Sequence, residues 1–575
     1  MLVISLTNEY PVLKLDLIFR SLNSLSLVQR HNAQRGCFMK GFSRREFLKA
    51  SGSAIALPLS TSLTLKGCSF DQEMLTIAYG ANLSSWDPTT GLSSLNPQIQ
   101  SFYKAVFDSF IGQSPDRSLR PGILIDWGWN DDRSKIQMTV RRDAFWHDGL
   151  PVTADDVVWS LERAGNSVNG NPMHFIWSKI TNFSVSGNTV TADVSEYDPT
   201  IFKWMVHLTG YILPKHAYTA LGADAWEQTP IGSGPYMVDK YEQNNSVLLR
   251  AFPQYWGPKP QFETVLIKMI PDAQARVEAL EAGKCDLAVG LSFSEFNRVT
   301  SKTSWTGNAY PVTDVGLIFL TNKDALMKDR NIRLAMHHAI DKQKLIDELM
   351  LGYGRPMDSL QVPGYDAYDP SVGFGRPMDS FQVPLFDAYD PSIKTDFDPY
   401  RARNYLSKSG YSKSKPVNLT IQTTQGYRPK DYEMVKMITE MWQEVGIEAN
   451  IQIHADKEHL RLRARHELAP AAFFNWSNST GDPFMSTGLA MLSNSPDSTF
   501  KSAELDRLIM PLMNEADERK RIRGYQKIDR YIADEGLIIP LVQFFQTVAH
   551  SGDIEFTPHS SGEVLLQEIR SLKLQ

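Results

Sequence analysis

The chain has 575 residues, of which 42% are hydrophobic, 22% charged and 11% aromatic, and this globular composition excludes disorder, collagen-like repeats and disulfide scaffolds. At roughly 150 residues per domain, there is room for three or four compact units. The net charge is −6, but residues 1–68 hold nine Lys or Arg and three Asp or Glu, so residues 69–575 carry −12. Such an acidic chain does not attract nucleic acid, and we expect no nucleic-acid partner.

Residues 1–68 have the pattern of an export leader. From residue 43 the sequence reads S-R-R-E-F-L-K, and an uncharged stretch rich in Ala, Ser and Leu follows. This string is similar to a twin-arginine export signal, so we expect the twin-arginine translocase to read Arg44 and Arg45 and to export the folded protein to the periplasm. Met39 gives a normal short leader, and we expect translation to start there.

The end of the leader has two interpretations. Leu65-Lys66-Gly67-Cys68 is similar to a bacterial lipobox, in which case Cys68 would be lipidated and would anchor the protein to a membrane. Alternatively, Ala54-Ile55-Ala56 is the cleavage site. The chain has three cysteines, and only Cys285 would remain inside the fold, so we expect no intrachain disulfide. No run of 18 apolar residues occurs, so no spanning helix is expected.

Helices and short strands alternate from about Met74, which predicts an α/β fold. Thr153 and Asp156 form an acidic capping box at the start of one helix, ahead of apolar residues that recur on one face. Asp272 begins a second helix, and Gly283 ends it. We expect a strand at 285–289 and further helices at 331–350, 398–408, 430–445 and 518–535.

Residues 352–372 and 373–393 form a tandem repeat with a period of 21 residues, and sixteen of the twenty-one positions are identical. Two copies are too few for a solenoid. Pro, Gly and Asp dominate both copies, so we interpret the segment as a loop duplicated in place, which adds little closure entropy. Its role is open between a neutral surface insertion and a lid over a site.

One stretch indicates a family. Residues 144–163 read AFWHDGLPVTADDVVWSLER, which resembles the signature of the family 5 extracellular solute-binding proteins, the dipeptide, oligopeptide and nickel receptors of ABC importers. Further matches extend the resemblance over nearly all of residues 74–575. They are Leu119-Arg120-Pro121, IGSGPY at 231–236, YWG at 255–257, LEAG at 280–283, IRLA at 332–335, FDP at 397–399, WQEVGI at 442–447 and GDP at 481–483.

The resemblance implies a two-lobe periplasmic binding protein-like fold of class II, with lobes joined by two crossover strands. The first lobe would take residues 74–311 and the second 312–540, which includes the duplicated loop, and residues 541–575 would return to the first lobe. A ligand that contacts both lobes favours the closed state. The implied partner is an ABC permease in the inner membrane, and we expect the receptor to be a monomer.

The sequence contains none of four common enzyme motifs, G-x-S-x-G, H-E-x-x-H, the P-loop and G-x-G-x-x-G after a strand. We therefore expect a protein that is not an enzyme and needs no cofactor. His147 is best explained as a histidine satisfied by its own turn. His454, His459 and His466 have metal-binding potential, but Arg and Lys surround them, so we expect a solvated face rather than a metal site.

The resemblance also suggests a ligand site with two departures from peptide receptors. Ser479 stands where those receptors place an aspartate for the ligand's ammonium group, and Gln425, with Arg428 as the nearest base, stands where dipeptide receptors place a base for the ligand's carboxylate. An unpaired ammonium group is costly to bury, so unmodified peptides should bind poorly unless Asp482 or another acid serves instead. The candidate ligand-binding residues are Asn82, Ser84, Trp86, Gln425, Arg428, Asn475, Trp476, Asn478, Ser479 and Asp482.

The function expected from these observations is that of an extracytoplasmic solute-binding receptor that delivers a small molecule or peptide to an ABC permease. A sugar-like, chelated or blocked ligand would suit the two departures. A metal-chelate receptor of the nickel type is the first alternative. A secreted hydrolase, whose carboxylates would meet only in the fold, is the alternative from another class.

Overall fold

The computed structural model describes residues 74–89, 96–114, 118–171, 173–362 and 388–574. One eleven-stranded sheet dominates it, with the strand order β15-β14-β16-β12-β17-β11-β1-β10-β9-β8 and with β13 paired to β17. Its strands are β1 (Leu75–Tyr79), β8 (Tyr236–Glu242), β9 (Ser246–Ala251), β10 (Thr264–Met269), β11 (Leu287–Val289), β12 (Trp305–Leu320), β13 (Gly354–Pro356), β14 (Val417–Thr423), β15 (Ile447–Ile453), β16 (Ala471–Ser477) and β17 (Ile538–Ser551). The mixed sheet and its helices confirm the predicted α/β class.

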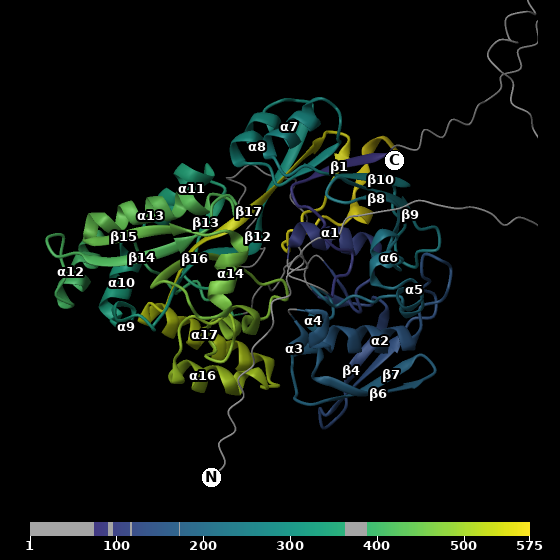
Figure 1. Ribbon diagram of the computed structural model, residues 1–575, viewed down its shortest axis with the longest axis horizontal. Helices are drawn as coiled ribbons and strands as arrows, with labels where there is room; N and C mark the ends of the chain where they lie inside the picture. The colour runs from purple at the N-terminus through teal and green to yellow at the C-terminus, as the bar shows by residue number, and fades with distance from the viewer. Residues whose placement is uncertain (1–73, 90–95, 115–117, 172, 363–387, 575) are drawn as a thin grey trace, which may run out of the picture. The chain divides into compact units, whose positions relative to one another are not determined.

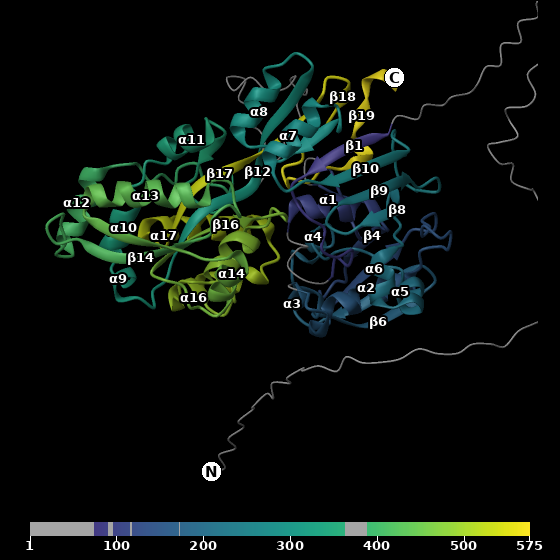
Figure 2. The same ribbon diagram turned by 45° about the horizontal axis from the view of Figure 1, so that its top comes forward.

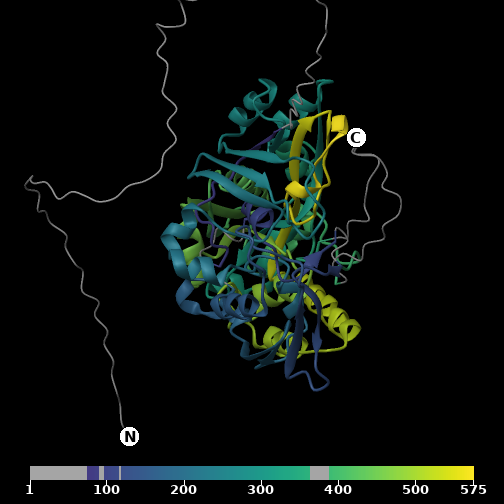
Figure 3. The same ribbon diagram turned by 90° about the vertical axis from the view of Figure 1, so that its right-hand side faces the viewer.

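Two long strands join the lobes. β12 and β17 are antiparallel neighbours from the pair Trp305 and Ser551 to the pair Phe319 and Ile538, and yellow β17 runs beside β12 in Figure 1 and can be followed in Figure 3. β17 also pairs with β11 of the first lobe, and β12 with β16 of the second. Both strands therefore belong to both lobes, and the predicted lobe boundaries fall inside them.

The first lobe also holds a four-stranded sheet of order β4-β5-β7-β6. Helix α2 packs against β6 and β7, while α7 packs against β1 and β11 (Figure 2). The remaining elements of this lobe are α1 (Pro97–Val106), β2 (Gly112–Gln113), β3 (Leu119–Arg120), β4 (Leu124–Trp129), β5 (Lys135–Val140), α2 (Ala154–Gly165), η2 (Ser167–Asn169), α3 (His174–Trp177), β6 (Ile180–Ser186), β7 (Thr189–Val194), α4 (Ile201–Trp204), α5 (Lys215–Leu221), α6 (Ala223–Gln228), α7 (Ala273–Glu281) and α8 (Phe293–Thr300).

In the second lobe, α13 packs against β14 and β15, and α10 packs against α12. Its helices are α9 (Ala325–Lys328), α10 (Arg330–His338), α11 (Lys342–Met350), α12 (Pro399–Lys408), α13 (Asp431–Val445), α14 (Asp456–Ala464), the π-helix η4 (Phe484–Gly488), α15 (Leu489–Met491), α16 (Ala503–Met513) and α17 (Glu518–Glu535). After β17 the chain forms β18 (Ile554–Glu555), η5 (Leu566–Glu568), β19 (Arg570–Ser571) and η6 (Leu572–Leu574).

The predicted helix starts follow from side-chain caps. Thr153 accepts a hydrogen bond from the backbone N–H of Asp156, and the Asp156 carboxylate accepts one from the backbone N–H of Thr153, which confirms the capping box of α2. Asp272 caps α7, and Gly283 follows that helix with a φ of 65°. Each cap satisfies backbone donors that the first helical turn leaves free.

The prediction of one helix over 331–350 is wrong, because the segment forms α10 and α11 with a break between them. Asp341 accepts a hydrogen bond from the backbone N–H of Lys344 and so caps a new helix. The apolar residues keep their helical spacing across the break, which is why the sequence predicts one helix. The Asp341 cap nevertheless stabilises the start of a second helix there.

The first part of the duplicated segment is built into the second lobe. β13 pairs with β17 at the point where β17 also pairs with β12. Lys342 Nζ donates to the carbonyl of Met357 at 2.6 Å, and Gln361 Nε2 donates to Thr487 Oγ1 at 2.8 Å. Residues 352–362 of the first copy are thus structural rather than an appended surface loop.

The end of the second copy is also anchored in the fold. Arg530 Nη2 donates to Asp390 Oδ2 at 2.5 Å, and Ala388 is buried. The described start of copy one and the described end of copy two together make most of a single repeat. The residues between them, 363–387, lie outside the described residues, and the lid interpretation depends on them.

Deleting residues 373–393 should leave the free energy of unfolding within ~1 kcal/mol of the parent value. The first copy ends in the same D-A-Y-D-P-S sequence, so Asp369 can replace Asp390 beside Arg530. Urea unfolding checks this result, with deletion of 352–393 as the control that removes β13 and should be far more damaging. A loss of several kcal/mol for the shorter deletion would show that the two copies are not interchangeable.

Arg44, Arg45 and Cys68, the predicted export and lipidation residues, lie outside the described residues. Within the described part of the chain, no helix is both long enough and apolar enough to span a membrane. The leader therefore remains a sequence-based prediction.

Candidate functional site

Three neighbouring strands of the second lobe end at one edge of the large sheet. β14 is parallel to β15 and to β16, so their carboxyl ends meet there. The loops that follow them are 424–430, 454–455 and 478–482, and we call these three loops the carboxyl edge. In open α/β sheets, ligands bind outside the carboxyl ends of the strands, which makes this edge the candidate site.

A buried aspartate, Asp431, orders the first of these loops. Its carboxylate accepts hydrogen bonds from Thr424 Oγ1 at 2.6 Å and from the backbone N–H groups of Gly426, Tyr427 and Arg428 at 2.8, 3.2 and 3.1 Å. Because these bonds fix the backbone of the loop, Asp431 positions Arg428. The Gln425 side chain is on the same loop and is exposed to solvent.

Arg428 is the basic group of the carboxyl edge. Its guanidinium lies 4.4 Å from the centre of the Tyr427 ring, and it makes no salt bridge with any residue in the described ranges. Burial raises the pKa of the nearby Asp456, while the charge of Arg428 and a hydrogen bond with Tyr427 oppose that shift. Arg428 is half-buried. Because it makes no salt bridge within the described ranges, its guanidinium is available to a ligand.

Asp314 of β12 lies beside Asn475 of β16. Asn475 Nδ2 donates to both Asp314 carboxylate oxygens, at 2.6 and 2.7 Å. Burial raises the pKa of Asp314, and the charge of Arg428 and the bond from Asn475 lower it in part. The fold thus brings two predicted site residues, Arg428 and Asn475, to one acid that was not predicted.

The end of β16 and the loop after it hold three predicted residues in different roles: Trp476 in the strand, and Asn478 and Ser479 in the loop. Trp476 is buried, and its Nε1 donates to the carbonyl of Met485 at 2.9 Å, so it packs as a core residue. Asn478 Nδ2 donates to the carbonyl of Asp482 at 2.8 Å and shapes the turn. Ser479 is half-buried, and its hydroxyl donates to Met485 Sδ at 3.9 Å.

Asp482 does not replace the missing acid, because its carboxylate is already paired. Arg521 Nη1 and Nη2 donate to its two oxygens at 2.6 and 2.5 Å, and Lys203 Nζ lies 3.3 Å away. Burial alone would raise the pKa of Asp482, but the charges of Arg521 and Lys203 outweigh burial and lower it. Since Lys203 belongs to α4, this ion pair also links the two lobes.

The first-lobe candidates lie in the loop after β1. Trp86 is fully buried against Tyr241, with 5.7 Å between the ring centres, and its backbone N–H donates to Glu227 Oε2 at 2.6 Å. Asn82 and Ser84 are exposed. Trp86 is thus a core residue, whereas Asn82 and Ser84 are accessible to solvent.

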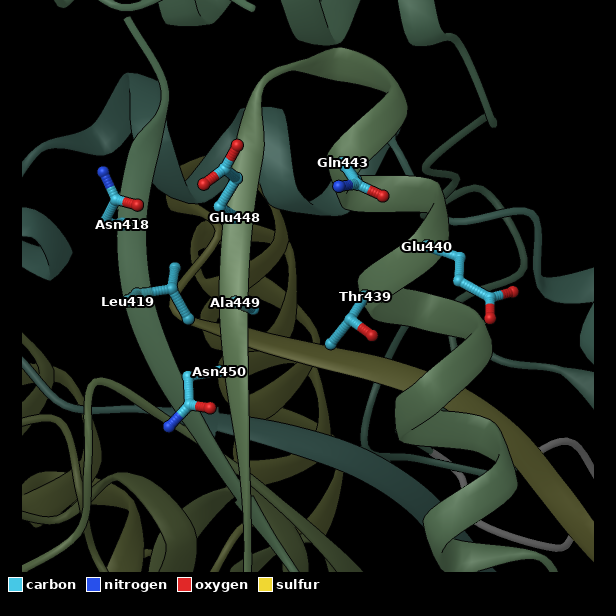
Figure 4. Close-up of a pocket in the computed structure, with 8 residues that line it drawn as sticks. All are labelled: Asn418, Leu419, Thr439, Glu440, Gln443, Glu448, Ala449 and Asn450. Carbon is cyan, nitrogen blue, oxygen red and sulfur yellow. The ribbon is translucent and has the colours of Figure 1, made fainter.

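A hollow of about 500 Å³ lies at the opposite end of the same strands. Figure 4 shows its lining from β14, β15 and α13: Asn418, Leu419, Thr439, Glu440, Gln443, Glu448, Ala449 and Asn450. The strand residues come from the amino-terminal halves of β14 and β15, away from the carboxyl edge. The exposed polar side chains there form a solvated surface.

His147 is satisfied by a neighbouring turn. Its Nδ1 accepts from the backbone N–H of Gly232, and its Nε2 lies 3.1 Å from the carbonyl oxygen of Gly234. Burial lowers the pKa of His147 to about 4, so the ring is neutral near pH 7. The histidine therefore joins two of the matched motifs and serves the architecture.

Of the three predicted histidines, His454 and His459 lie side by side, with 6.2 Å between their ring centres. His459 is buried, stacks on Phe474 with 4.0 Å between ring centres, and contacts the carbonyl of Phe473 at 2.8 Å. His466 lies beyond the end of α14 with a φ of 55°, so it does not share a helix face with His459. Among the described residues, no group of three His, Cys, Asp or Glu side chains is placed to hold a metal ion.

Comparison with known proteins places the chain in a family. The family profile for bacterial extracellular solute-binding proteins, family 5 (middle region), matches residues 118–497. This is more than half of the chain, so the chain belongs to that family. The resemblance seen in residues 144–163 is therefore confirmed.

The relatives cover most of the chain at low identity. The dipeptide-binding protein of Escherichia coli is 23% identical over 533 residues, which are 87% of this chain and 94% of that protein. The periplasmic binding protein DppA from Helicobacter pylori, solved with the peptide STSA, matches with a TM-score of 0.72 at 18% identity over 87% of this chain and 98% of its own. NikZ from Campylobacter jejuni, solved with Ni(L-His), matches with a TM-score of 0.70 at 18% identity. The match covers 87% of this chain and 99% of NikZ. These matches confirm the two-lobe periplasmic binding protein fold.

Proposed function

We propose that the protein is an extracytoplasmic receptor that binds a short peptide and delivers it to an ABC permease. The observation that carries the proposal is Arg428, a half-buried guanidinium held in place by the loop around Asp431 and unpaired within the described ranges. A planar guanidinium binds a carboxylate through two parallel hydrogen bonds. Arg428 thus supplies the base for the ligand's carboxylate, with Gln425 on the same loop and Ser479 on the loop after β16 as further ligand contacts.

Closure of the two lobes on the ligand is the proposed mechanism, with Asn82 and Ser84 as the first-lobe contacts. Two side-chain contacts between the lobes support it: Lys203 with Asp482 at 3.3 Å, and Asn514 Nδ2 with Glu196 Oε1 at 2.8 Å. A ligand that adds further contacts between the lobes favours the closed state by the free energy of those contacts. No bond in the ligand needs to change, so the receptor is not an enzyme.

A metal-chelate receptor is the second candidate, since relatives such as NikZ were solved with Ni(L-His). A hydrolase is the third, and it would need a pair of acids at the carboxyl edge. Asp314 and Asp456 are the half-buried acids there, and among the described residues no group of three His, Cys, Asp or Glu side chains is placed to hold a catalytic metal ion. Arg428 lies near these acids without forming a salt bridge within the described ranges. Peptide binding without turnover accounts for that arrangement better than hydrolysis does.

Replacing Arg428 with glutamine should weaken binding of unmodified di- to pentapeptides about 30-fold or more, because losing one partner of a buried charge pair costs about 2–5 kcal/mol. Isothermal titration of each peptide measures the affinity. The exposed Arg465 at the end of α14 is the matched control, and Arg465→Gln should bind as the parent does. A parent that binds no peptide but binds nickel–histidine would favour the metal-chelate receptor.

For localisation, we propose that the twin-arginine translocase exports the protein to the periplasm, where it acts as a monomer, with Cys68 as the site of lipid attachment. The support is the S-R-R-E-F-L-K string and the Leu65-Lys66-Gly67-Cys68 sequence. Cell fractionation of a chain with both Arg44 and Arg45 changed to lysine tests the route, and normal export of that chain would contradict it.

A further inference from the structure

We propose that Asp314 receives the positively charged end of the ligand and is the counterpart of Arg428 at the carboxyl edge. This inference rests on the proposed function and names the ligand class more closely: a zwitterion with a free ammonium group as well as a carboxylate. It gives Asp314 the role that the neutral Ser479 cannot fill.

The backbone of β12 places Asp314 at this edge. Its pairing with β17 is irregular between Pro311 and Val315, and such irregularities redirect side chains and occur often beside binding sites. On its other side, Asp314 lies opposite Ser477, the last residue of β16. The carboxylate is therefore held where β16 leads into the loop 478–482.

The Asp314 carboxylate has hydrogen-bonding capacity left for a ligand. Within the described part of the chain, its one hydrogen-bond partner is Asn475 Nδ2, which contacts both oxygens. An ionised carboxylate offers about four lone-pair sites. A half-buried carboxylate without a cation is costly, and an ammonium group would offset that cost and use the remaining sites.

Arg428 and Asp314 are close to each other but not paired. The charge of Arg428 acts on the Asp314 carboxyl, yet no salt bridge joins the two side chains. Had they been paired, each would have neutralised the other. Because they are not paired, Arg428 can bind the carboxylate of a zwitterionic ligand while Asp314 binds its ammonium group.

The other acids of this region are already committed. Asp482 is held by Arg521 and Lys203. Asp456 is hydrogen-bonded with Tyr427, and as the first residue of α14 it lies where a helix stabilises negative charge. Among the described residues, by contrast, Asp314 forms no salt bridge, and it lies in a strand rather than at a helix end.

The test compares unmodified di- to pentapeptides with the same peptides N-acetylated, by isothermal titration with the purified protein. The parent should prefer the free form by about tenfold or more, because acetylation removes the ammonium charge. Asp314→Asn should abolish that preference by weakening the free form alone. The matched control is Glu448→Gln, an exposed acid at the amino-terminal end of β15, and it should keep the preference.

Other results separate this inference from the proposed function. A parent that binds both peptide forms equally, or an Asp314→Asn variant that keeps the preference, would overturn the role of Asp314 and leave peptide binding intact. Loss of the preference in Asp456→Asn instead would assign the ammonium group to Asp456 and overturn the inference. A parent that binds neither form would contradict the proposed function itself. If Asp314→Asn does not fold, Asn475→Ala, which removes the donor that holds Asp314, should reduce the preference.

Discussion

Replacing Arg521 with methionine should lower the free energy of unfolding by about 3–5 kcal/mol, the usual cost of removing one partner from a buried ion pair. The side chains of Asp482 and Arg521 are 2% and 4% exposed, and they share two hydrogen bonds. Without Arg521, Lys203 at 3.3 Å is the one cationic partner that the described residues leave to the Asp482 carboxylate. The remaining buried charge then opposes folding.

Urea unfolding at pH 7 measures this change. Arg519→Met, at an exposed position on the same helix, is the control and should stay within about 0.5 kcal/mol of the parent. The double change of Asp482→Asn with Arg521→Met should recover part of the loss, since it removes both charges. A loss below about 1 kcal/mol for Arg521→Met would show that the pair does not hold the loop 478–482 in place.

The Arg521 effect should also depend on pH. Because the folded-state pKa of Asp482 is below its ordinary value of 3.8, the pair stabilises the fold above that pH and loses its effect as the pH falls through the folded-state pKa. The difference between the parent and Arg521→Met should therefore shrink in acid. A constant difference across this range would contradict the pairing.

Replacing Asp529 with asparagine should raise the free energy of unfolding at pH 8 by about 2–4 kcal/mol, at 1.36 kcal/mol per pKa unit. Burial raises the pKa of Asp529 from 3.8 to about 7. Between these values the folded state holds a proton that the unfolded state has lost, so the parent loses stability as the pH rises towards 7. Asparagine is neutral throughout and keeps an oxygen that can accept the bond from Thr487 Oγ1.

Thermal unfolding at pH 5 and pH 8 checks this prediction. The gain from Asp529→Asn should be much smaller at pH 5 than at pH 8, because the parent carboxyl is then largely protonated. The exposed Asp534, near the end of the same helix, is the control, and Asp534→Asn should show no such dependence. Equal stability of Asp529→Asn and the parent at pH 8 would mean that Asp529 is ionised at little cost.

Local signals explain how much of the fold could be predicted. Thr153, Asp272 and Asp398 are side-chain caps whose effect lies within one turn of helix, so their helices could be located from the sequence. The break at Asp341 was missed because the apolar spacing runs through it. β13 was missed because three residues rich in Gly and Pro gain their strand structure only from pairing with β17.

The candidate site could be predicted only in part. Arg428 and Asn475 come from loops and strands that the family resemblance located. Asp314 was missed because its role depends on the pairing of β12 with β16, a contact between residues 161 positions apart. The available signal was an acid at the head of the apolar run 315–320. Trp476 was included for its position in the family pattern, and burial makes both Trp86 and Trp476 core residues.

Small-angle scattering of the protein with and without the panel of unmodified di- to pentapeptides, followed by mass spectrometry of each peptide, tests the central claim most directly. A receptor whose lobes close on a peptide held at the carboxyl edge should show a smaller radius of gyration with a bound peptide and should return that peptide intact. Arg428→Gln should show neither the decrease nor the retained peptide. Cleaved peptide, or a decrease that persists in Arg428→Gln, would contradict the account.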